Sequence, residues 1–193
     1  MDLVLASGSP RRAELLKRLG VPYRVIVSEV EEGISCPPWS QWVQEVACLK
    51  ARNVASFAGE IVLAADTIVL KAGRVLGKPA DEQEAETMLT FLAGDVHEVF
   101  TGICIVNCLT KEVWRDVGVT KVYFRSLTEQ EIKAYIASGE ALDKAGAYGI
   151  QGLGSLLIEK IEGCYYNVVG LPLVKTMNLL RKCGVQILGQ NDN

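Results

Sequence analysis

The sequence predicts an α/β fold, and three observations support this prediction. A short apolar segment at residues 3–6 is followed by a turn of small residues and a helix. Two longer β segments, 97–109 and 113–124, are joined by a short turn in the manner of an antiparallel hairpin. Capping residues also begin several helices between the strands. Hydrophobic residues make up 49% of the 193 positions, so one large domain or two small lobes can share a buried core.

The first half of the chain predicts strands that alternate with helices. A helix is expected over about residues 10–19, because Ser9 suits the N-cap and Pro10 suits the first helical position. Asp81 with Glu84 resembles a capping box at the start of a later helix. The other elements expected here are strands at 3–6, 23–27, 61–70 and 75–76, and helices at 40–57 and from 81 to 94.

The second half predicts the hairpin, a helix and a glycine-rich loop. Thr128 with Glu131 signals the start of the helix, and Gly139 can end it. The elements expected after it are a glycine-rich loop at 143–155, a strand at 156–161 and a helix at 171–182. No repeat, linker or low-complexity segment separates these elements, so residues 1–193 are expected to form a single domain.

Charge and hydropathy exclude several classes of partner. The net charge is −3 and the basic residues are scattered, which argues against a broad face for a nucleic-acid polymer. No apolar run approaches the roughly 18 residues of a membrane helix. The N-terminus carries Asp2 where a signal peptide has positive charge. We therefore expect a cytoplasmic protein that binds neither membranes nor nucleic-acid polymers.

The cysteine pattern argues against disulfides and zinc. Six cysteines form no CxxC pair, and the chain has one histidine. Cys104 and Cys108 share a face of an expected strand but would lie about 13 Å apart along it, which is too far for a disulfide. Reduced core cysteines are expected instead.

The turn after the first strand has the features of a phosphate-binding site. Residues 6–12 read ASGSPRR, and small residues at such a turn leave backbone N–H groups at a helix N-terminus. Arg11 and Arg12 lie in the first helical turn, where cations oppose the macrodipole unless an anion compensates. An ordinary capped helix with solvated arginines is the alternative. Segment 73–79 is one residue too short for a Walker loop and carries Pro79 at its Ser/Thr position, which disfavours a kinase or GTPase.

Asp66 is the one charge inside an apolar strand, and a buried carboxylate without a partner would cost several kcal/mol. Its partner is expected to be either a divalent metal with a catalytic water or a structural Lys or Arg, and the local sequence leaves both open. Glu29, Glu31 and Glu32 offer oxygen ligands suited to Mg²⁺ or Mn²⁺. A lone histidine at a strand start, such as His97, is more often structural than catalytic.

The glycine-rich segment 146–154 reads GAYGIQGLG and is too apolar for a solvated linker. Glycines let a backbone approach a ligand or another segment closely. The amide of Gln151 could match a uracil or thymine ring, which presents an acceptor O4 beside a donor N3–H. A tight structural turn explains the glycines equally well on local grounds.

Six ordered motifs span nearly the whole chain. They are LASGSPRR at 5–12, AADT at 64–67, GKP at 77–79, HEVFTG at 97–102, DKAGAYGIQG at 143–152 and NVVGLP at 167–172. In this combination the chain resembles the Maf family of nucleoside triphosphate pyrophosphatases, whose fold is related to that of the inosine triphosphate pyrophosphatases. An ordered series of this kind is far more specific than any single motif.

The resemblance implies a mixed twisted sheet with flanking helices, in two lobes around a central cleft. It also implies hydrolysis of dTTP or UTP between the α and β phosphates, giving the nucleoside monophosphate and pyrophosphate with Mg²⁺ or Mn²⁺ as the metal. The alternative is a nucleotide-binding regulator of septum formation with little turnover. The hairpin near residues 109–113 is a candidate surface for a homodimer, and the sequence leaves this open.

The resemblance further assigns roles to individual residues. Asp66 matches the proton acceptor and, with Glu32, the metal ligands. The positions matching the phosphate site are Ser7, Arg11, Arg12, Lys50 and Lys78. The positions matching base selection are Arg12, Thr67 and Gln151. We therefore expect Asp66 to help deprotonate a metal-bound water that attacks the α-phosphorus, while the cations neutralise the leaving pyrophosphate.

Overall fold

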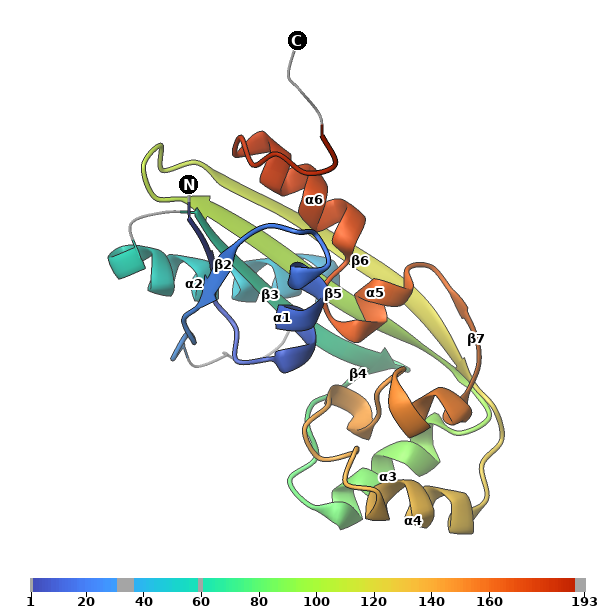
Figure 1. Cartoon of the computed structure of the whole chain (residues 1–193). Helices are drawn as coiled ribbons and strands as arrows, with labels where there is room; N and C mark the ends of the chain where they lie inside the picture. The colour runs from blue at the N-terminus through green and yellow to red at the C-terminus, as the bar shows by residue number, and fades with distance from the viewer. Residues whose placement is uncertain (1, 31–36, 59–60, 190–193) are drawn as a thin grey trace. The chain divides into compact units, whose positions relative to one another are not determined.

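The computed structural model describes residues 2–30, 37–58 and 61–189, and its architecture is α/β, as the sequence predicts (Figure 1). The strands are β1 (Leu3–Leu5), β2 (Tyr23–Val25), β3 (Ile61–Lys71), β4 (Arg74–Leu76), β5 (Val96–Asn107), β6 (Val113–Phe124) and β7 (Ile158–Glu162). The α-helices are α1 (Pro10–Lys17), α2 (Trp39–Ala58), α3 (Glu82–Leu92), α4 (Glu129–Ala137), α5 (Tyr165–Val169) and α6 (Leu173–Lys182). Two 3₁₀ turns, η1 (Ala145–Ala147) and η2 (Gly152–Leu157), lie within the glycine-rich region.

The strands form one mixed sheet of seven strands in the order β2-β1-β3-β5-β6-β7, with β4 paired to β3. β1 is parallel to both β2 and β3, whereas β4 is antiparallel to β3 and β7 is antiparallel to β6. The expected hairpin is present, because a short turn closed by a bond from Asn107 N–H to Glu112 O joins β5 to β6. The predicted mixed sheet with flanking helices is thus confirmed.

The chain divides into two compact units. The first contains residues 1–66, 101–118 and 170–193, and the second contains residues 67–100 and 119–169. Strands β3, β5 and β6 contribute residues to both units.

In the first unit, helix α2 covers one face of the sheet. The cluster that it forms with the strands consists of Val4, Ala6, Ala47, Cys48, Ala51, Val54, Val62, Ala64, Cys104, Val106 and Cys108. The strand members have even numbers, as the alternation of side chains along a strand requires. Their odd-numbered neighbours, such as Leu5 and Leu63, are also buried, and α1 and α6 lie on the opposite side of the sheet from α2 (Figure 1).

Gly102 explains how closely α2 approaches the sheet. A Cβ atom added to this residue of β5 would lie 2.3 Å from the carbonyl carbon and oxygen of Val43 and 2.6 Å from the backbone nitrogen of Gln44. Any side chain at position 102 would therefore push α2 away from β5. The glycine therefore permits α2, which carries Lys50, to lie close to the strands.

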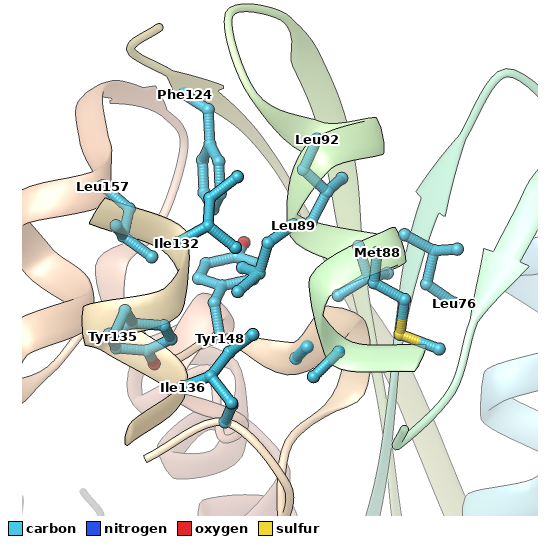
Figure 2. Close-up of a cluster of buried hydrophobic side chains, with 14 of the residues drawn as sticks. Leu76, Met88, Leu89, Leu92, Phe124, Ile132, Tyr135, Ile136, Tyr148 and Leu157 are labelled. Atoms are coloured by element: carbon cyan, nitrogen blue, oxygen red, sulfur yellow. The ribbon is translucent and has the colours of Figure 1, made fainter. Parts of the chain in front are cut away.

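In the second unit, α3 and α4 enclose an apolar core that Figure 2 shows from close by. Leu89 and Leu92 of α3 face Ile132 and Ile136 of α4, and the ring of Tyr148 lies between the two helices. Both helices begin as predicted. The side chain of Asp81 caps α3 through Glu84 N–H, and Thr128 with Glu131 forms a reciprocal capping box at α4.

Some boundaries differ from the predicted ones. Strand β2 ends at Val25, two residues earlier than expected, and α6 begins at Leu173 rather than at 171. The short helix α5 was not expected at all. It ends at Val169, and the next residue, Gly170, has a φ of +115°, which no helix can contain.

The described cysteines agree with the prediction of reduced thiols. Cys48, Cys104, Cys108, Cys164 and Cys183 are all free. The thiol nearest to Cys104 comes from α2, where Cys48 Sγ lies 2.7 Å from Cys104 Sγ. Among residues 2–30, 37–58 and 61–189, no helix is long and apolar enough to span a membrane.

His97 is a structural residue of the second unit, as expected. Its side chain is 2% exposed, and Nε2 lies 2.6 Å from the hydroxyl oxygen of Tyr148. The imidazole makes edge contacts with the rings of Phe124 and Tyr148, and its Nδ1 is buried without a hydrogen-bond partner in the described structure. Burial, aided by the nearby charge of Lys71, lowers the pKa of His97 from 6.5 to about 4.

The lowered pKa of His97 makes stability depend on pH. Between pH 6.5 and 4 the unfolded chain binds a proton that the folded chain excludes, so stability is lost as the pH falls through this window. The expected loss is about 3 kcal/mol, obtained from the size of the shift. Urea unfolding at several pH values should show this slope in the wild type and a weaker slope in His97→Gln. Because the chain has one histidine, an equal slope in both proteins would contradict the assignment.

Candidate functional site

The turn between β1 and α1 is organised by the hydroxyl groups of two serines. Ser9 is the N-cap of α1, and its Oγ accepts a hydrogen bond from Arg12 N–H. Ser7 is buried, and its Oγ accepts a bond of 3.2 Å from Ser9 N–H. The N–H groups of Ser9 and Arg12 are thus bonded to hydroxyl oxygens of the same turn, as expected for a capped helix. The phosphate site at this turn stays a prediction.

Arg12 links this turn to a distant segment of the same unit. Its Nε donates to the carbonyl oxygen of Gly170 at 2.9 Å, and its Nη1 donates to Ser7 Oγ at 3.2 Å. A cation in the first turn of α1 thus has acceptors within the protein, and a bound anion is not needed to explain it. Arg11 is half-buried beside it in the same helical turn.

The partner of Asp66 is Lys50. Lys50 Nζ lies 2.7 Å from Asp66 Oδ1, and the two side chains are 14% and 6% exposed. Asp66 points to the same face of β3 as Val62 and Ala64, and Lys50 lies three residues after Ala47 on the face of α2 that covers those residues. Local periodicities in the helix and the strand therefore bring the two charges together.

The carboxylate of Asp66 is only half satisfied by this pair. Its Oδ2 is buried and has no hydrogen-bond partner within the described residues. Leaving a charged oxygen in that state is costly, so the site suits a second cationic partner. The ion-pair alternative raised by the sequence is thus confirmed, and the free oxygen is compatible with a divalent cation as well.

The donor set for a divalent metal is incomplete in the described residues. Within 2–30, 37–58 and 61–189, no group of three or more His, Cys, Asp or Glu side chains could hold a metal ion. Glu32, the other predicted ligand, lies outside the described residues. Mg²⁺ is commonly bound through one or two carboxylates together with waters and substrate phosphates. Asp66 with its free oxygen fits that pattern.

The turn and Asp66 both follow the segment in which β1 pairs with β3. β1 and β3 are parallel, with Leu5 paired to Leu63, and Ala6 N–H continues the ladder to Leu63 O at 2.7 Å. Ser7 and Asp66 both follow this pairing, Ser7 just after the carboxyl end of β1 and Asp66 within the part of β3 that continues past β1, on the side where α/β sheets commonly bind ligands. The first unit therefore gathers the turn and the Lys50–Asp66 pair at one edge.

The remaining predicted residues belong to the second unit. Thr67 follows Asp66 in β3 and is half-buried, with its side chain on the opposite face of the strand. Lys78 is exposed in the turn after β4, and the carbonyl of its neighbour Gly77 accepts a bond from Gly146 N–H at 2.9 Å. This bond joins the turn to the glycine-rich loop. Gln151 is half-buried at the N-cap position of η2, where its side chain makes no capping bond.

The sequence reading missed the anchor of Arg12 at Gly170. Gly170 lies in the recognised motif at 167–172, but a backbone carbonyl that accepts a bond from residue 12 has no signature in the sequence. It also missed Glu140, which binds the glycine-rich loop. The only signal for it is an acidic residue between a helix end and that loop.

The Lys50–Asp66 pair should be important for stability. Replacing Lys50 by Met leaves a buried carboxylate without a partner, and we expect the free energy of unfolding to fall by about 3 kcal/mol. The double variant Lys50→Met/Asp66→Asn should recover part of this loss, because it removes the buried charge. Urea unfolding of the single and double variants measures both effects.

A matched control is available in the same unit. Lys175 and Asp116 are 2.8 Å apart, but their side chains are 42% and 36% exposed. Lys175→Met should therefore cost at most about 1 kcal/mol. If Lys50→Met and Lys175→Met lower the free energy of unfolding equally, the buried pair stabilises the fold no more than the exposed pair does.

Comparison with known proteins shows which family the chain resembles. Residues 2–183 match the family described as Maf-like protein. A dTTP/UTP pyrophosphatase of Syntrophomonas wolfei is 50% identical over 186 residues, which cover 95% of this chain and 98% of that protein. A dTTP/UTP pyrophosphatase of Moorella thermoacetica is 49% identical over 191 residues, covering 97% of this chain and 98% of the relative.

Solved structures support the fold. The Ham1 protein of Staphylococcus aureus has a TM-score of 0.55 at 15% identity, covering 96% of this chain and 100% of that one. A HAM1 protein from Coxiella burnetii has a TM-score of 0.55 at 19% identity, covering 94% of this chain and 99% of that one. At such low identity the likeness concerns the fold alone. With a family match along almost its whole length and relatives near half identity, the chain belongs to the Maf-like protein family.

Proposed function

We propose that this protein is a nucleoside triphosphate pyrophosphatase that hydrolyses dTTP and UTP to the nucleoside monophosphate and pyrophosphate. The names of its relatives support the substrates and the reaction. Among the features of the chain, the strongest support is the buried Asp66, whose Oδ1 is bonded to Lys50 and whose Oδ2 has no hydrogen-bond partner in the described structure. A buried carboxylate that is held in place and keeps one oxygen available is suited to accept a proton.

A divalent cation, Mg²⁺ or Mn²⁺, is the expected cofactor. Asp66 and Glu32 would hold it, together with the phosphates of the substrate. When bound, such a cation lowers the pKa of a coordinated water and offsets negative charge on phosphate. The half-satisfied carboxylate of Asp66 is the observation that supports this fit.

The chain's own residues would prepare the attack on the α-phosphorus. Asp66 accepts the proton of the attacking water. The bond of 2.7 Å from Lys50 Nζ to Oδ1 orients the carboxylate of Asp66. Burial of this pair also keeps bulk water away from the proton acceptor.

Cations and hydroxyl groups would bind the triphosphate and the base. We assign phosphate contacts to Ser7, Arg11, Arg12, Lys50 and Lys78, which offset the charge that develops on the leaving pyrophosphate. Arg12, Thr67 and Gln151 are assigned to selection of the base. The bonds of Arg12 to Ser7 and Gly170 hold its guanidinium at the N-terminal turn, next to the residues assigned to phosphate binding. The cytoplasmic location stays a prediction, as do the homodimer and the single-domain organisation.

Product analysis tests the proposed reaction. Purified protein is incubated with each nucleoside triphosphate and Mg²⁺ or Mn²⁺, and pyrophosphate and orthophosphate are measured separately. Pyrophosphate released from dTTP and UTP supports the proposal. Orthophosphate as the first product would move the attack to the γ-phosphorus, and no product with retained nucleotide binding would favour a regulatory protein.

Asp66→Asn keeps the shape of the side chain and removes its charge. We expect the rate of pyrophosphate release from dTTP to fall at least about 100-fold, the typical contribution of a general base. Asp116→Asn, which changes the half-exposed partner of Lys175, is the matched control and should keep wild-type activity. Thermal unfolding of both variants checks that they are folded. Turnover by Asp66→Asn at the wild-type rate would rule out the assigned role.

A further inference from the structure

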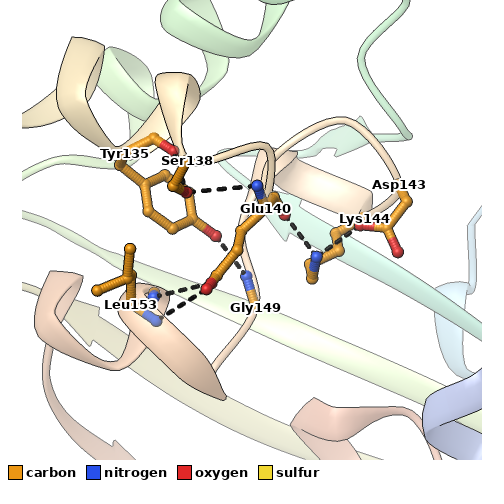
Figure 3. A network of polar contacts seen from close by, with 8 residues as sticks. Tyr135, Ser138, Glu140, Asp143, Lys144, Gly149 and Leu153 are labelled. Atoms are coloured by element: carbon orange, nitrogen blue, oxygen red, sulfur yellow. Dashed lines mark hydrogen bonds and ion pairs between the residues drawn. The ribbon is translucent and has the colours of Figure 1, made fainter.

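Glu140 binds the glycine-rich loop next to Gln151 (Figure 3). It follows the end of α4, and its carboxylate accepts hydrogen bonds from the backbone N–H groups of Leu153 at 3.2 Å and Gly154 at 3.4 Å. These two residues belong to the first turn of η2. The carboxylate of Glu140 therefore satisfies N–H groups that a short helix leaves without an internal partner.

Glu140 takes over the capping task that the N-cap residue often performs. Gln151 occupies the N-cap position of η2, yet its side chain makes no capping hydrogen bond. A carboxylate at this end of a helix is also favoured by the helix dipole. Because Glu140 caps η2 from outside the loop, the side-chain amide of Gln151 is not needed for a capping bond to the backbone of η2.

The glycines of the loop are required by this packing. A Cβ atom on Gly152 would lie 2.6 Å from Glu140 Oε1, and the φ of Gly152 is +62°. A Cβ on Gly154 would lie 2.0 Å from the carbonyl oxygen of Gly149, and one on Gly149 would lie 2.8 Å from Lys144. The sequence left open whether these glycines approach a ligand or another segment. At these positions they approach other segments of the second unit.

Further bonds hold Glu140 and the opposite end of the loop. The hydroxyl of Tyr135 accepts a bond from Gly149 N–H at 3.2 Å. Lys144 Nζ donates to the backbone carbonyl of Glu140, and Glu140 N–H donates to Ser138 Oγ (Figure 3). Gln151 thus lies between two anchored points of the backbone, one at Gly149 and one at residues 153–154.

We infer that Glu140 is a positioning residue for base selection, which holds Gln151 so that its amide meets the O4 and N3–H edge of a uracil or thymine ring. This inference rests on the proposed function. Glu140 itself touches no substrate in this assignment. It acts through the backbone of the loop, and its effect should appear in the choice between bases rather than in the chemistry at phosphorus.

Selectivity between UTP and CTP is the sharpest readout, because these nucleotides differ only at the edge that Gln151 would read. In Glu140→Ala the ratio of kcat/KM for UTP to that for CTP should fall about tenfold, the equivalent of one lost hydrogen bond. The loss should appear mainly in the KM for UTP. Glu140→Gln keeps one acceptor oxygen and should fall between the wild type and Glu140→Ala.

Glu84→Gln is the matched control. The carboxylate of Glu84 also accepts a backbone bond, from Ala80 N–H at 2.8 Å, but this bond lies at the start of α3 and outside residues 149–154. This variant should leave the UTP to CTP ratio unchanged. If the UTP to CTP ratio falls similarly in Glu140→Gln and Glu84→Gln, Glu140 has only a general structural role and the inference is overturned.

Two further measurements separate the inference from the proposed function. Amide hydrogen exchange should be faster at Leu153 and Gly154 in Glu140→Ala, and unchanged exchange would overturn the cap without any assay of activity. If Gln151→Ala loses the preference for UTP while Glu140→Ala keeps it, the inference falls and the proposed function stands. If the wild type releases no pyrophosphate from any nucleotide, both fall together, although the exchange experiment still tests the cap.

Discussion

A carboxylate buried in strand β3 is the constraint around which the first unit is arranged. Asp66 lies on the face of the sheet that α2 covers, among apolar neighbours where an isolated charge would be prohibitively costly. Lys50 from α2 meets one oxygen of this carboxylate. For that contact α2 must lie very close to the strands, and Gly102 of β5 permits the approach. The packing of the helix and the placement of the charge pair are therefore one structural requirement.

The N-terminal turn is ordered by the same residues to which we assign a proposed role in phosphate binding. Ser7 and Ser9 order the turn, and Arg12 fastens it to Gly170 near the other end of the chain. These bonds fix the guanidinium in place before any ligand arrives. Donors that are already fixed suit a phosphate site, because the long side chain is ordered during folding. Binding of the phosphate then carries a smaller entropic cost.

In the second unit, the buried titratable side chains lie apart from the loop that carries Gln151. Its core holds His97 and Tyr148, whose burial lowers the pKa of the histidine and raises that of the tyrosine. The loop around Gln151 is instead held by peripheral polar contacts, with Glu140 supplying the cap that Gln151 does not supply for itself. The loop can therefore be well ordered and still present an amide to a ligand.

The sequence by itself predicted most of the helices and strands and named the candidate site residues. Capping residues such as Ser9, Asp81 and Thr128 predicted where helices begin, since these bonds are local. The need of Asp66 for a partner also followed from one charge in an apolar strand. The partner's identity and the bonds of Arg12 and Glu140 depend on the tertiary structure, because their acceptors and donors are backbone groups or residues remote in sequence. Backbone N–H and C=O groups are the same at nearly every position, so no residue pattern predicts which of them form these bonds. Only the tertiary structure determines which groups lie within hydrogen-bond distance.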